Sequence, residues 1–489
     1  MPSRHPHITG GDGAALRAAL DDLRHRIGVP HAFPASVLAD AERAARTPRL
    51  PAEDATHLPF FTVDPPGSHE LDHALHLTRT PHGGFRVHHA VSDTAAFVTP
   101  GRPLDTEAHR RAVALPFPDL RVPLHPHRIA EDAASLLPDV PRPALLWTLD
   151  LDADGTLTAT DVRRALVRSH ARLDPDTVQR ELDDGTAEDS VALLRDVGRL
   201  CEERERARGG ISLNAPEQRI VPHGDRYRLD HRPLLPAERW TAQLSVLLGT
   251  AAAALMLDGG TGVLRTLPQA PDGAVARLHR VARALDVDWP PHTSYAALLR
   301  SLDPRRPRHA AFLQECTALL SGAGYTAFGR GGPGPRPTGR PHHPEHAAVA
   351  APYTHCTAPL GRLVDRYTGE LCLAAIAGTE PPEWVSGALA ALPATMERGE
   401  RRAAEADDAC LELMTAAVLW DHVGEVFDGL VTDVREDRPH EGTVHLAEPP
   451  VAGRVSVPPD GPPLPLGEPL RVRLLHADPG RSPVRFGPA

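Results

Sequence analysis

The chain has 489 residues, of which 41% are hydrophobic, so it is long enough for several domains with substantial cores. Its formal net charge is -11, and all 53 basic residues are arginines. This charge excludes a protein that coats nucleic acid through a strongly basic surface, but it is compatible with an enzyme that has one arginine-lined groove.

The cysteines and the N-terminus indicate the compartment. Five cysteines are scattered along the chain and form no C-x-x-C pair: Cys201, Cys316, Cys356, Cys372 and Cys410. This pattern fits a reducing environment better than a zinc module or a disulfide framework. The N-terminus lacks the apolar core of a signal peptide, and no stretch approaches the ~20 apolar residues of a membrane span. We therefore expect a cytoplasmic protein without membrane contact.

The first fifty residues are predicted to form a small helical lead. Two short helices are expected over Gly13–Ile27 and Ala35–Arg46, separated by a Gly-Val-Pro turn. The leucines of the first helix recur at helical spacing, which indicates one buried face. We expect this lead, residues 1–55, to pack on the main core.

Acidic residues are concentrated in the segment 62–74, which reads TVDPPGSHELDHA and follows the apolar run 58–63. The apolar run is typical of a buried strand, and the Pro-Pro-Gly sequence predicts a turn where it ends. Asp64 can then face Glu70 and Asp72. Clustered carboxylates repel one another unless a cation lies between them, and carboxylate oxygens suit magnesium or manganese. The alternative is a solvated acidic turn.

Strand patterns dominate from residue 58 to about residue 165. The expected strands are Phe60–Val63, Ala74–Leu77, Phe85–His88 and Leu145–Leu151. The segment Asp150–Gly155 has the aspartate spacing of a calcium-binding EF-hand loop. An EF-hand needs a helix on each side, however, and an Asp-Gly pair between two strand-like runs predicts a β-hairpin instead.

The rest of the chain is predicted to be helical first and stranded at the end. Helices are expected over residues 175–208, Trp240–Leu257 and Ala388–Val423, and the Gly- and Pro-rich segment Gly322–Glu345 is expected to be a loop. Strands are expected at Val426–Val434, Gly442–Leu446, Val451–Val457 and Leu470–Leu475. Short strands separated by Pro- and Gly-rich turns suggest a small OB-type barrel.

Two separated motifs resemble the RNB family, the catalytic domain of ribonuclease II and ribonuclease R. Asp64, Glu70 and Asp72 match the first three acidic residues of the family signature T-I-D-P…D-x-D-D-A, and His73 stands where a fourth aspartate is usual. Far downstream, residues 353–365 read YTHCTAPLGRLVD and resemble the family's Y-x-H-F-T-S-P-I-R-R-Y-x-D.

This resemblance implies an α+β fold. An RNB-type catalytic domain, a mixed sheet with flanking helices, would cover residues 56–422, followed by a C-terminal OB-type barrel over residues 423–489. Relatives of ribonuclease II usually begin with cold-shock-type barrels, and the short lead has no room for one. The C-terminal barrel has almost no aromatic residues for stacking on bases.

The resemblance also implies the chemistry: hydrolysis of single-stranded RNA from the 3′ end to nucleoside monophosphates, assisted by Mg²⁺ or Mn²⁺. Asp64, Glu70, Asp72 and His73 are the implied metal ligands. Asp72 is also the implied catalytic carboxylate, and Arg362 the arginine that stabilises charge on the phosphate.

Six further residues are implied to contact the substrate: Asp93, Phe117, Arg265, Tyr353, His355 and Thr357. For two of them a structural role is equally consistent with the sequence. Asp93 stands at a turn, where a carboxylate can cap the next element, and Arg265 is compatible with an ordinary surface position. We expect a monomer that binds single-stranded RNA and has no protein partner.

Three positions depart from the family pattern. His73 replaces an acidic residue, Gly361 stands in place of the first arginine of the R-R pair, and Pro116 replaces a tyrosine, with Phe117 one place along. The alternative function is therefore an RNA-binding member of the family that has lost catalysis. A pure protein scaffold would have no use for three carboxylates in register with the family signature.

Overall fold

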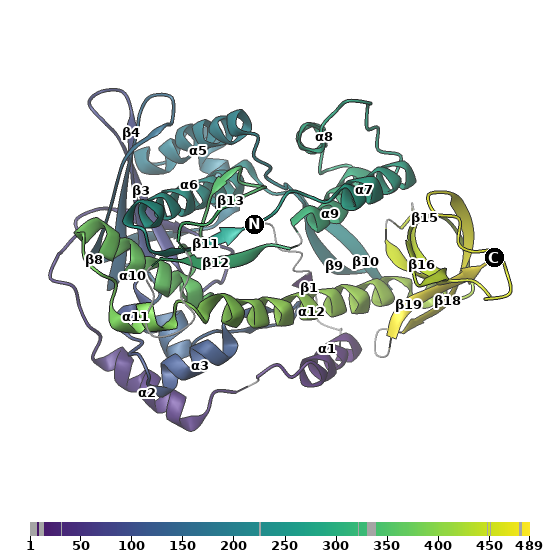
Figure 1. The fold of residues 1–489 in the computed structure, drawn as a ribbon, viewed down its shortest axis with the longest axis horizontal. Helices are drawn as coiled ribbons and strands as arrows, with labels where there is room; N and C mark the ends of the chain where they lie inside the picture. The colour runs from purple at the N-terminus through teal and green to yellow at the C-terminus, as the bar shows by residue number, and fades with distance from the viewer. Residues whose placement is uncertain are drawn as a thin grey trace.

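A long helix joins the two parts of the molecule. The computed structural model describes residues 7–8, 14–30, 32–223, 226–320, 322–329, 339–446, 448–449, 451–478 and 482–489. Helix α12 (Leu392–Leu419) runs from the larger N-terminal body to the C-terminal barrel, where it packs against strands of that barrel. Figure 1 shows this helix crossing the centre of the molecule.

The N-terminal lead contains both predicted helices, α1 (Ala14–Arg26) and α2 (Ala35–Arg46). Helix α1 packs on α12, and α2 packs on α3 (Pro103–Arg111). Their buried faces carry the expected apolar spacing, including Leu16 and Leu20. The short strand β1 (His7–Ile8) also pairs in parallel with β9 (Glu217–His223), which is followed by β10 (Arg226–Arg232).

The predicted mixed sheet of the main body closes into a five-stranded barrel. Its strands are β2 (Phe60–Val63), β3 (His73–Arg79), β4 (Phe85–Ser92), β7 (Pro141–Leu151) and β8 (Leu157–Leu173), in the order β2-β3-β4-β7-β8. Strand β2 is parallel to β8, and the other neighbours are antiparallel. The alternating pattern predicts the strands, but closure depends on pairing between the first and the last.

The β7–β8 connection confirms the predicted hairpin and not a calcium loop. Strands β7 and β8 are antiparallel, and the Asp152 carboxylate accepts hydrogen bonds from the backbone N–H groups of Asp154 and Thr156 in the turn between them. Gly155 has a positive φ of 76°, which a glycine adopts readily. A strand on each side leaves no place for the two helices of an EF-hand.

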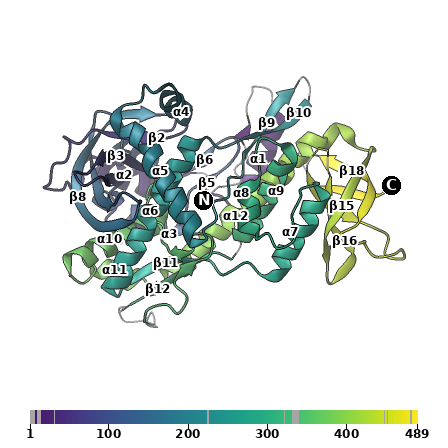
Figure 2. The same cartoon turned by 90° about the horizontal axis from the view of Figure 1, so that it is seen from above.

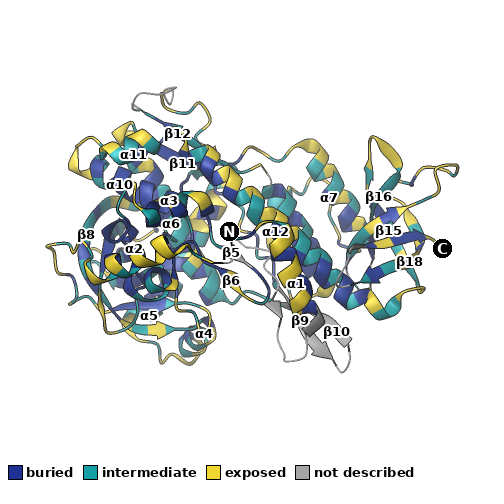
Figure 3. Ribbon diagram, turned by 90° about the horizontal axis from the view of Figure 1, so that it is seen from below, coloured by how far each residue is buried: buried dark blue, intermediate teal, exposed yellow. Residues whose placement is uncertain are grey.

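Helices cover this barrel. The segment 175–208 forms α4 (Pro175–Asp184) and α5 (Asp189–Arg208), which pack with α6 (Pro236–Gly259); α10 (Leu363–Ala377) packs on α6. Helix α6 is long and apolar enough to cross a membrane by length and composition alone, but 56% of its most apolar window is buried inside the fold. Figure 3 shows how burial concentrates on these helices and on the barrel strands.

The middle of the chain forms a two-stranded ribbon and a helical subdomain. Strand β11 (Gly262–Thr266) pairs with β12 (Gly324–Phe328), so the loop predicted over Gly322–Glu345 is wrong for its first residues. The glycines at both ends of β12 hid a short strand that pairs with a distant partner. Within the same predicted loop, residues 330–338 lie outside the described residues. The helices of the subdomain are α7 (Asp272–Ala284), α8 (Tyr295–Ser301) and α9 (Pro307–Glu315).

The C-terminal barrel confirms the predicted OB-type architecture. Its strands are β15 (Val426–Arg435), β16 (Arg438–Leu446), β17 (Ala452–Ser456), β18 (Pro469–Asp478) and β19 (Ser482–Pro488), closed in the order β15-β16-β17-β19-β18. The sequence did not predict β19, which is short and bounded by Pro and Gly. Ala416 and Leu419 of α12 join the core of this barrel. Figure 2 shows the two barrels at opposite ends of the molecule.

Candidate active site

The acidic segment and the downstream motif meet through a direct hydrogen bond. Asp72 Oδ1 accepts a hydrogen bond of 2.7 Å from the backbone N–H of Leu360, which lies 288 positions later in the chain. Asp72 is held in place by its own backbone, because its carbonyl accepts a hydrogen bond of 2.8 Å from the N–H of Ser92 at the end of β4. Segments 62–74 and 353–365 therefore form one site.

A small hairpin forms a third side of this site. Strands β5 (Leu115–Pro116) and β6 (Arg121–Val122) pair with each other, and the N–H of Ala114 donates to the carbonyl of Gly361 at 2.8 Å. This hairpin brings the Arg121 guanidinium to 2.7 Å from a carboxylate oxygen of Glu70. Three segments distant in sequence thus surround the acidic residues.

Glu70 and Asp72 form a buried, mutually repelling pair of carboxylates. Burial raises the pKa of Asp72 to about 8, and the charge of Glu70 contributes to the increase. Burial also raises the pKa of Glu70, although the nearby Arg121 opposes the effect. Both carboxylate oxygens of Glu70 are buried without a hydrogen-bond donor among the described residues. Such a pair has the oxygen ligands and the unmet negative charge that suit a divalent cation.

Asp64 is also a buried carboxylate with a raised pKa and an unpartnered oxygen. It follows β2, and its N–H donates to the carbonyl of Leu173 at 3.0 Å. Burial raises the pKa of Asp64 to about 6, and its Oδ2 has no hydrogen-bond partner in the described part of the chain. Among the residues that the structure describes, however, no three His, Cys, Asp or Glu side chains are grouped closely enough to hold a metal ion. The full predicted ligand set is thus not gathered around one point.

His73 lies against another histidine. Its ring is 4.9 Å from the ring of His89, at an interplanar angle of 50°. Burial, together with the charge of Arg362, lowers the pKa of His73 to about 4, so the ring is neutral at pH 7. A neutral ring is able to bind a metal, but the contact with His89 is the one that the structure provides. The role of His73 as a ligand stays a prediction.

Arg362 is fixed by a buried carboxylate. Its Nε and Nη2 donate to the two oxygens of Asp365 at 3.0 and 2.9 Å, and Asp365 also accepts a hydrogen bond of 2.7 Å from the N–H of Ala358. Burial alone lowers the pKa of Arg362, but the paired Asp365 outweighs it and keeps the pKa above its usual value. The guanidinium is therefore permanently charged, and its orientation is set by a two-point contact.

Two cavities meet at Arg362. The first cavity has a volume of about 810 Å³, and the second about 700 Å³; Arg362 and Leu320 line both. Tyr353, His355 and Thr357 line the first cavity, as expected for residues that contact the substrate. The hydroxyl of Tyr325 and Nδ1 of His355 are 2.6 Å apart, which orients the imidazole.

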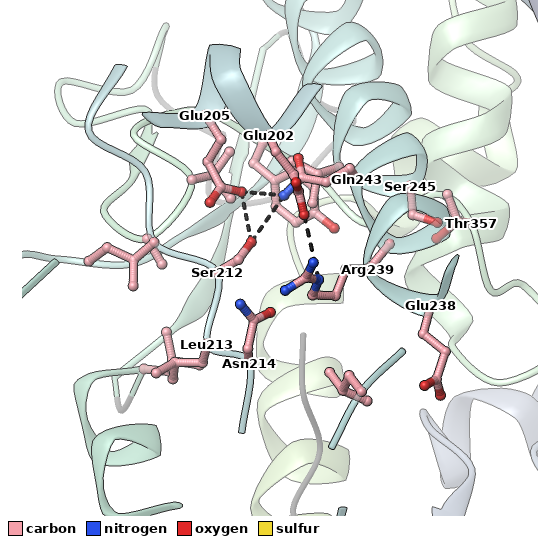
Figure 4. Close-up of a pocket in the computed structure, with 18 of the residues that line it drawn as sticks. Glu202, Glu205, Ser212, Leu213, Asn214, Glu238, Arg239, Gln243, Ser245 and Thr357 are labelled. Atoms are coloured by element: carbon pink, nitrogen blue, oxygen red, sulfur yellow. Dashed lines mark hydrogen bonds and ion pairs between the residues drawn. The ribbon is translucent and has the colours of Figure 1, made fainter. Parts of the chain in front are cut away.

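Polar side chains also line the first cavity, as Figure 4 shows. Gln243 of α6 donates to Glu205 at 2.6 Å and to the Ser212 hydroxyl at 3.1 Å, and Ser212 donates to Glu205 at 2.7 Å. The side chain of Gln243 is buried, yet its Oε1 has no hydrogen-bond partner in the described structure.

The remaining predicted substrate residues have structural partners. Arg265 lines the second cavity and forms an ion pair of 2.7 Å with Glu400. Asp93 is buried and pairs at 2.8 Å with Arg164, which also pairs with Glu370. The Phe117 ring is only 5% exposed and lies under the guanidinium of Arg24, 5.3 Å away. Neither Asp93 nor Phe117 lines either of the two cavities.

Sequence reasoning missed Arg121 and Gln243. Arg121 lies outside the two motifs that carry the family resemblance, and an isolated arginine carries no signal in a chain with so many. Gln243 had a clearer signal, because it interrupts the apolar helix expected over Trp240–Leu257. An uncharged polar residue on the buried face of such a helix needs a partner.

The fold is that of an α+β protein in which helix α12 joins the main body to a C-terminal barrel. The site in the main body contains a buried pair of carboxylates and an arginine, Arg362, that lines two cavities. The chain belongs to the RNB-domain family: the model of the RNB domain matches residues 52–377, and the model of the RNase II-type exonuclease C-terminal S1 domain matches residues 425–489. The predicted RNB fold and the predicted terminal barrel are both confirmed.

Known proteins resemble the chain at low sequence identity. Ribonuclease R of Escherichia coli is 24% identical over 457 residues, which are 87% of this chain and 54% of that protein. The chain spans between about a third and half of the length of the first curated relatives it matches. Among solved structures, Mycoplasma genitalium RNase R in complex with ribose methylated single-stranded RNA covers 98% of this chain with a TM-score of 0.76 and 17% identity. Yeast Ssd1, described as a pseudonuclease, covers 87% with a TM-score of 0.61 and 18% identity.

Proposed function

We propose that this chain is a 3′-to-5′ exoribonuclease that hydrolyses single-stranded RNA to nucleoside monophosphates with the help of Mg²⁺ or Mn²⁺. The observation that supports this most directly is the hydrogen bond between Asp72 and the N–H of Leu360, because it joins the acidic segment to the segment that carries Arg362. Membership of the RNB family and the exoribonucleases among its relatives support the same reaction.

The residues of the site have separate tasks in this reaction. A divalent ion bound at Glu70 and Asp72 would supply a water of lowered pKa and neutralise charge around the phosphate. Arg362, held by Asp365, lies where the two cavities meet and stabilises the negative charge that develops on the phosphoryl oxygens. Because Asp365 fixes the guanidinium beforehand, little reorganisation is needed during the reaction.

The first cavity is suited to the nucleotide next to this phosphate. Tyr353 and His355 line it with aromatic rings, and Gln243, whose buried Oε1 has no hydrogen-bond partner among the described residues, lines it as well. A ribose 2′-hydroxyl can donate to this acceptor, whereas deoxyribose cannot, so Gln243 would favour RNA over DNA. The cavity is also large enough for one nucleotide and its neighbouring sugar.

The second candidate is an RNA-binding protein without catalysis. It is favoured by the histidine at position 73, and by the finding that no three potential metal ligands are grouped together among the described residues. The likeness to the yeast pseudonuclease shows that this fold also occurs in a protein described as inactive.

Labelled RNA distinguishes the two functions. Purified protein is incubated with single-stranded RNA labelled at the 5′ or the 3′ end, in Mg²⁺, Mn²⁺ or EDTA, and the products are separated on a denaturing gel. The proposal expects immediate release of the labelled mononucleotide from the 3′ end and progressive shortening of the 5′-labelled strand. Binding without shortening in either metal would support the second candidate.

A further inference from the structure

Arg121 differs from the other arginines around the second cavity in how it is held. Arg265, Arg362 and Arg401 each donate hydrogen bonds to a carboxylate, at Glu400, Asp365 and Glu397 respectively. The Arg121 side chain lies 2.7 Å from Glu70, but both Glu70 oxygens lack a hydrogen-bond partner among the described residues, so this ion pair has no hydrogen-bond geometry. Its side chain is 48% exposed and lines the cavity beside Arg362. The N–H donors of Arg121 therefore stay available to a ligand in this cavity.

Gly361 makes room for this guanidinium. A Cβ atom built on Gly361 would lie 2.8 Å from Nη2 of Arg121, closer than real side chains approach, and its next neighbour would be the carbonyl oxygen of Ala358 at 3.8 Å. The conflict therefore concerns only the end of one flexible side chain. An alanine at position 361 would therefore force the Arg121 guanidinium to shift, while its Cβ would be in ordinary contact with the Ala358 carbonyl.

Besides Arg362, the site therefore contains a second positive charge, that of Arg121, which lies outside the sequence motif around Gly361. Gly361 stands directly before Arg362, and the β5–β6 hairpin delivers Arg121 from another part of the chain into the space beside that glycine. Arg121 and Arg362 line the same cavity, and the positive charge of each lowers the pKa of Asp72, so both lie close to the acidic pair.

We propose that Arg121 contacts the phosphate of bound RNA as the second guanidinium of the site, and that glycine at position 361 is what allows it to do so. The proposal rests on the proposed function for the nature of the ligand. In the free protein Arg121 forms an ion pair with Glu70, and on binding its half-exposed guanidinium turns toward the phosphate, whose charge-assisted hydrogen bonds replace that pair.

The first experiment measures RNA binding without catalysis. Affinity for a short single-stranded RNA is determined by fluorescence anisotropy in EDTA over a range of salt concentrations for wild type, Arg121→Ala, Arg121→Lys and Gly361→Ala. The slope of log K against log salt is negative, and loss of one phosphate contact makes it less negative by about 0.7 for a single strand. We expect this change in slope in Arg121→Ala, which removes the charge, and in Gly361→Ala, which keeps the Arg121 charge but displaces it. Arg121→Lys should show a smaller change, because the lysine keeps a positive charge at position 121.

Two matched controls separate this effect from general loss of charge or of glycine. Arg79 is an exposed arginine on β3 that pairs with Asp196, and Gly387 of α11 (Glu383–Ala388) has nothing within 4 Å of an added Cβ. Arg79→Ala and Gly387→Ala should leave the salt slope at the wild-type value. If Arg121→Ala also keeps the wild-type slope, Arg121 does not contact the phosphate and the proposal is wrong.

The second experiment removes the guanidinium at position 121 and supplies one from position 361 instead. In single-turnover cleavage with Mn²⁺, Arg121→Ala should be about 100-fold slower than wild type, by analogy with the loss of one charge-stabilising donor. The double variant Arg121→Ala/Gly361→Arg, which supplies a guanidinium from position 361, should recover part of this loss. Equal rates for wild type and Arg121→Ala would overturn the proposal. If wild type does not cleave RNA, the proposed function fails, and the salt slope in EDTA still decides whether Arg121 contacts phosphate.

Discussion

The ion pair between Arg362 and Asp365 allows the structural and the functional contribution of one arginine to be measured separately. Asp365 has a fully buried side chain, and it receives two hydrogen bonds from Arg362 and one from the N–H of Ala358. Removing the guanidinium leaves this carboxylate buried with a single donor. Breaking a buried ion pair in this manner costs about 3–5 kcal/mol, and we expect the lower end because the Arg362 side chain is 27% exposed.

The Arg362→Ala variant should therefore lose about 3 kcal/mol of unfolding free energy and about 100- to 1,000-fold in cleavage rate. Arg362→Leu combined with Asp365→Asn removes the unpaired charge and should recover most of the stability, because an amide can still accept the N–H of Ala358. It should recover none of the activity. Urea denaturation gives the free energies, and single-turnover cleavage of labelled RNA gives the rates.

The control is another two-point arginine pair at the surface. Arg86 donates to both oxygens of Asp150 at 2.7 and 2.8 Å, but its side chain is 46% exposed. Arg86→Ala should cost less than about 1 kcal/mol and leave cleavage unchanged. The reasoning is refuted if the double variant at Arg362 and Asp365 cleaves RNA at the wild-type rate, or if Arg362→Ala is no less stable than Arg86→Ala.

Three further outcomes follow from other parts of the structure. Asp72→Asn should abolish cleavage in Mg²⁺ and Mn²⁺ while leaving RNA affinity in EDTA nearly unchanged, since the amide keeps the hydrogen bond from Leu360; wild-type cleavage by this variant would remove Asp72 from the reaction. Gln243→Ala should reduce the preference for RNA over an equivalent DNA strand in competition binding, because it removes the buried acceptor; an unchanged preference would assign the discrimination elsewhere. Burial by itself raises the pKa of Asp40, but its hydrogen bonds with Arg43 and Arg102 outweigh this effect and lower the pKa. The ionised carboxylate therefore stabilises the folded protein at pH values above the unfolded pKa of 3.8. This contribution is lost as the pH falls through the lower folded pKa. Asp40→Asn should therefore be less stable than wild type at pH 7, and in acid denaturation the difference should begin to shrink below pH 3.8 and disappear once the pH is below the folded pKa of Asp40.

The parts of the fold that depend on local patterns were predictable from the sequence. The predicted strand at Phe60–Val63 and the predicted helix at Ala35–Arg46 have the same bounds in the structure, because each has an unbroken periodic pattern with clear ends. The strand Gly324–Phe328 was missed because its partner, β11, lies about sixty residues earlier and its own flanks read as a loop. Closure of the first barrel was missed for a similar reason, since it depends on the pairing of β2 with β8.

The candidate site was predictable only where its residues are contiguous. The segments 62–74 and 353–365 could be recognised separately, and the structure adds the hydrogen bond that joins them. For Phe117 the aromatic side chain suggested base stacking, but the ring is covered by Arg24 of the N-terminal lead. Whether an aromatic residue faces a cavity or the core is decided by a segment almost a hundred residues away, which the local pattern does not contain.

The substitution at Gly361 shows how a departure from a family motif can be misread when it is judged along the chain. In the sequence, Gly361 looks like the loss of a positive charge next to Arg362. In the structure, the absence of a side chain at this position is what admits Arg121, a charge supplied by a hairpin 240 residues away. The sum of charges near Glu70 and Asp72 is thus the same as it would be with an arginine pair, although the second arginine comes from β6. His73 is different, because the ring next to it is another histidine, and burial keeps both rings neutral. Of the two substitutions in the core of the site, the one at position 361 is therefore compensated by a neighbouring residue, and the one at position 73 is where a loss of metal affinity is to be sought.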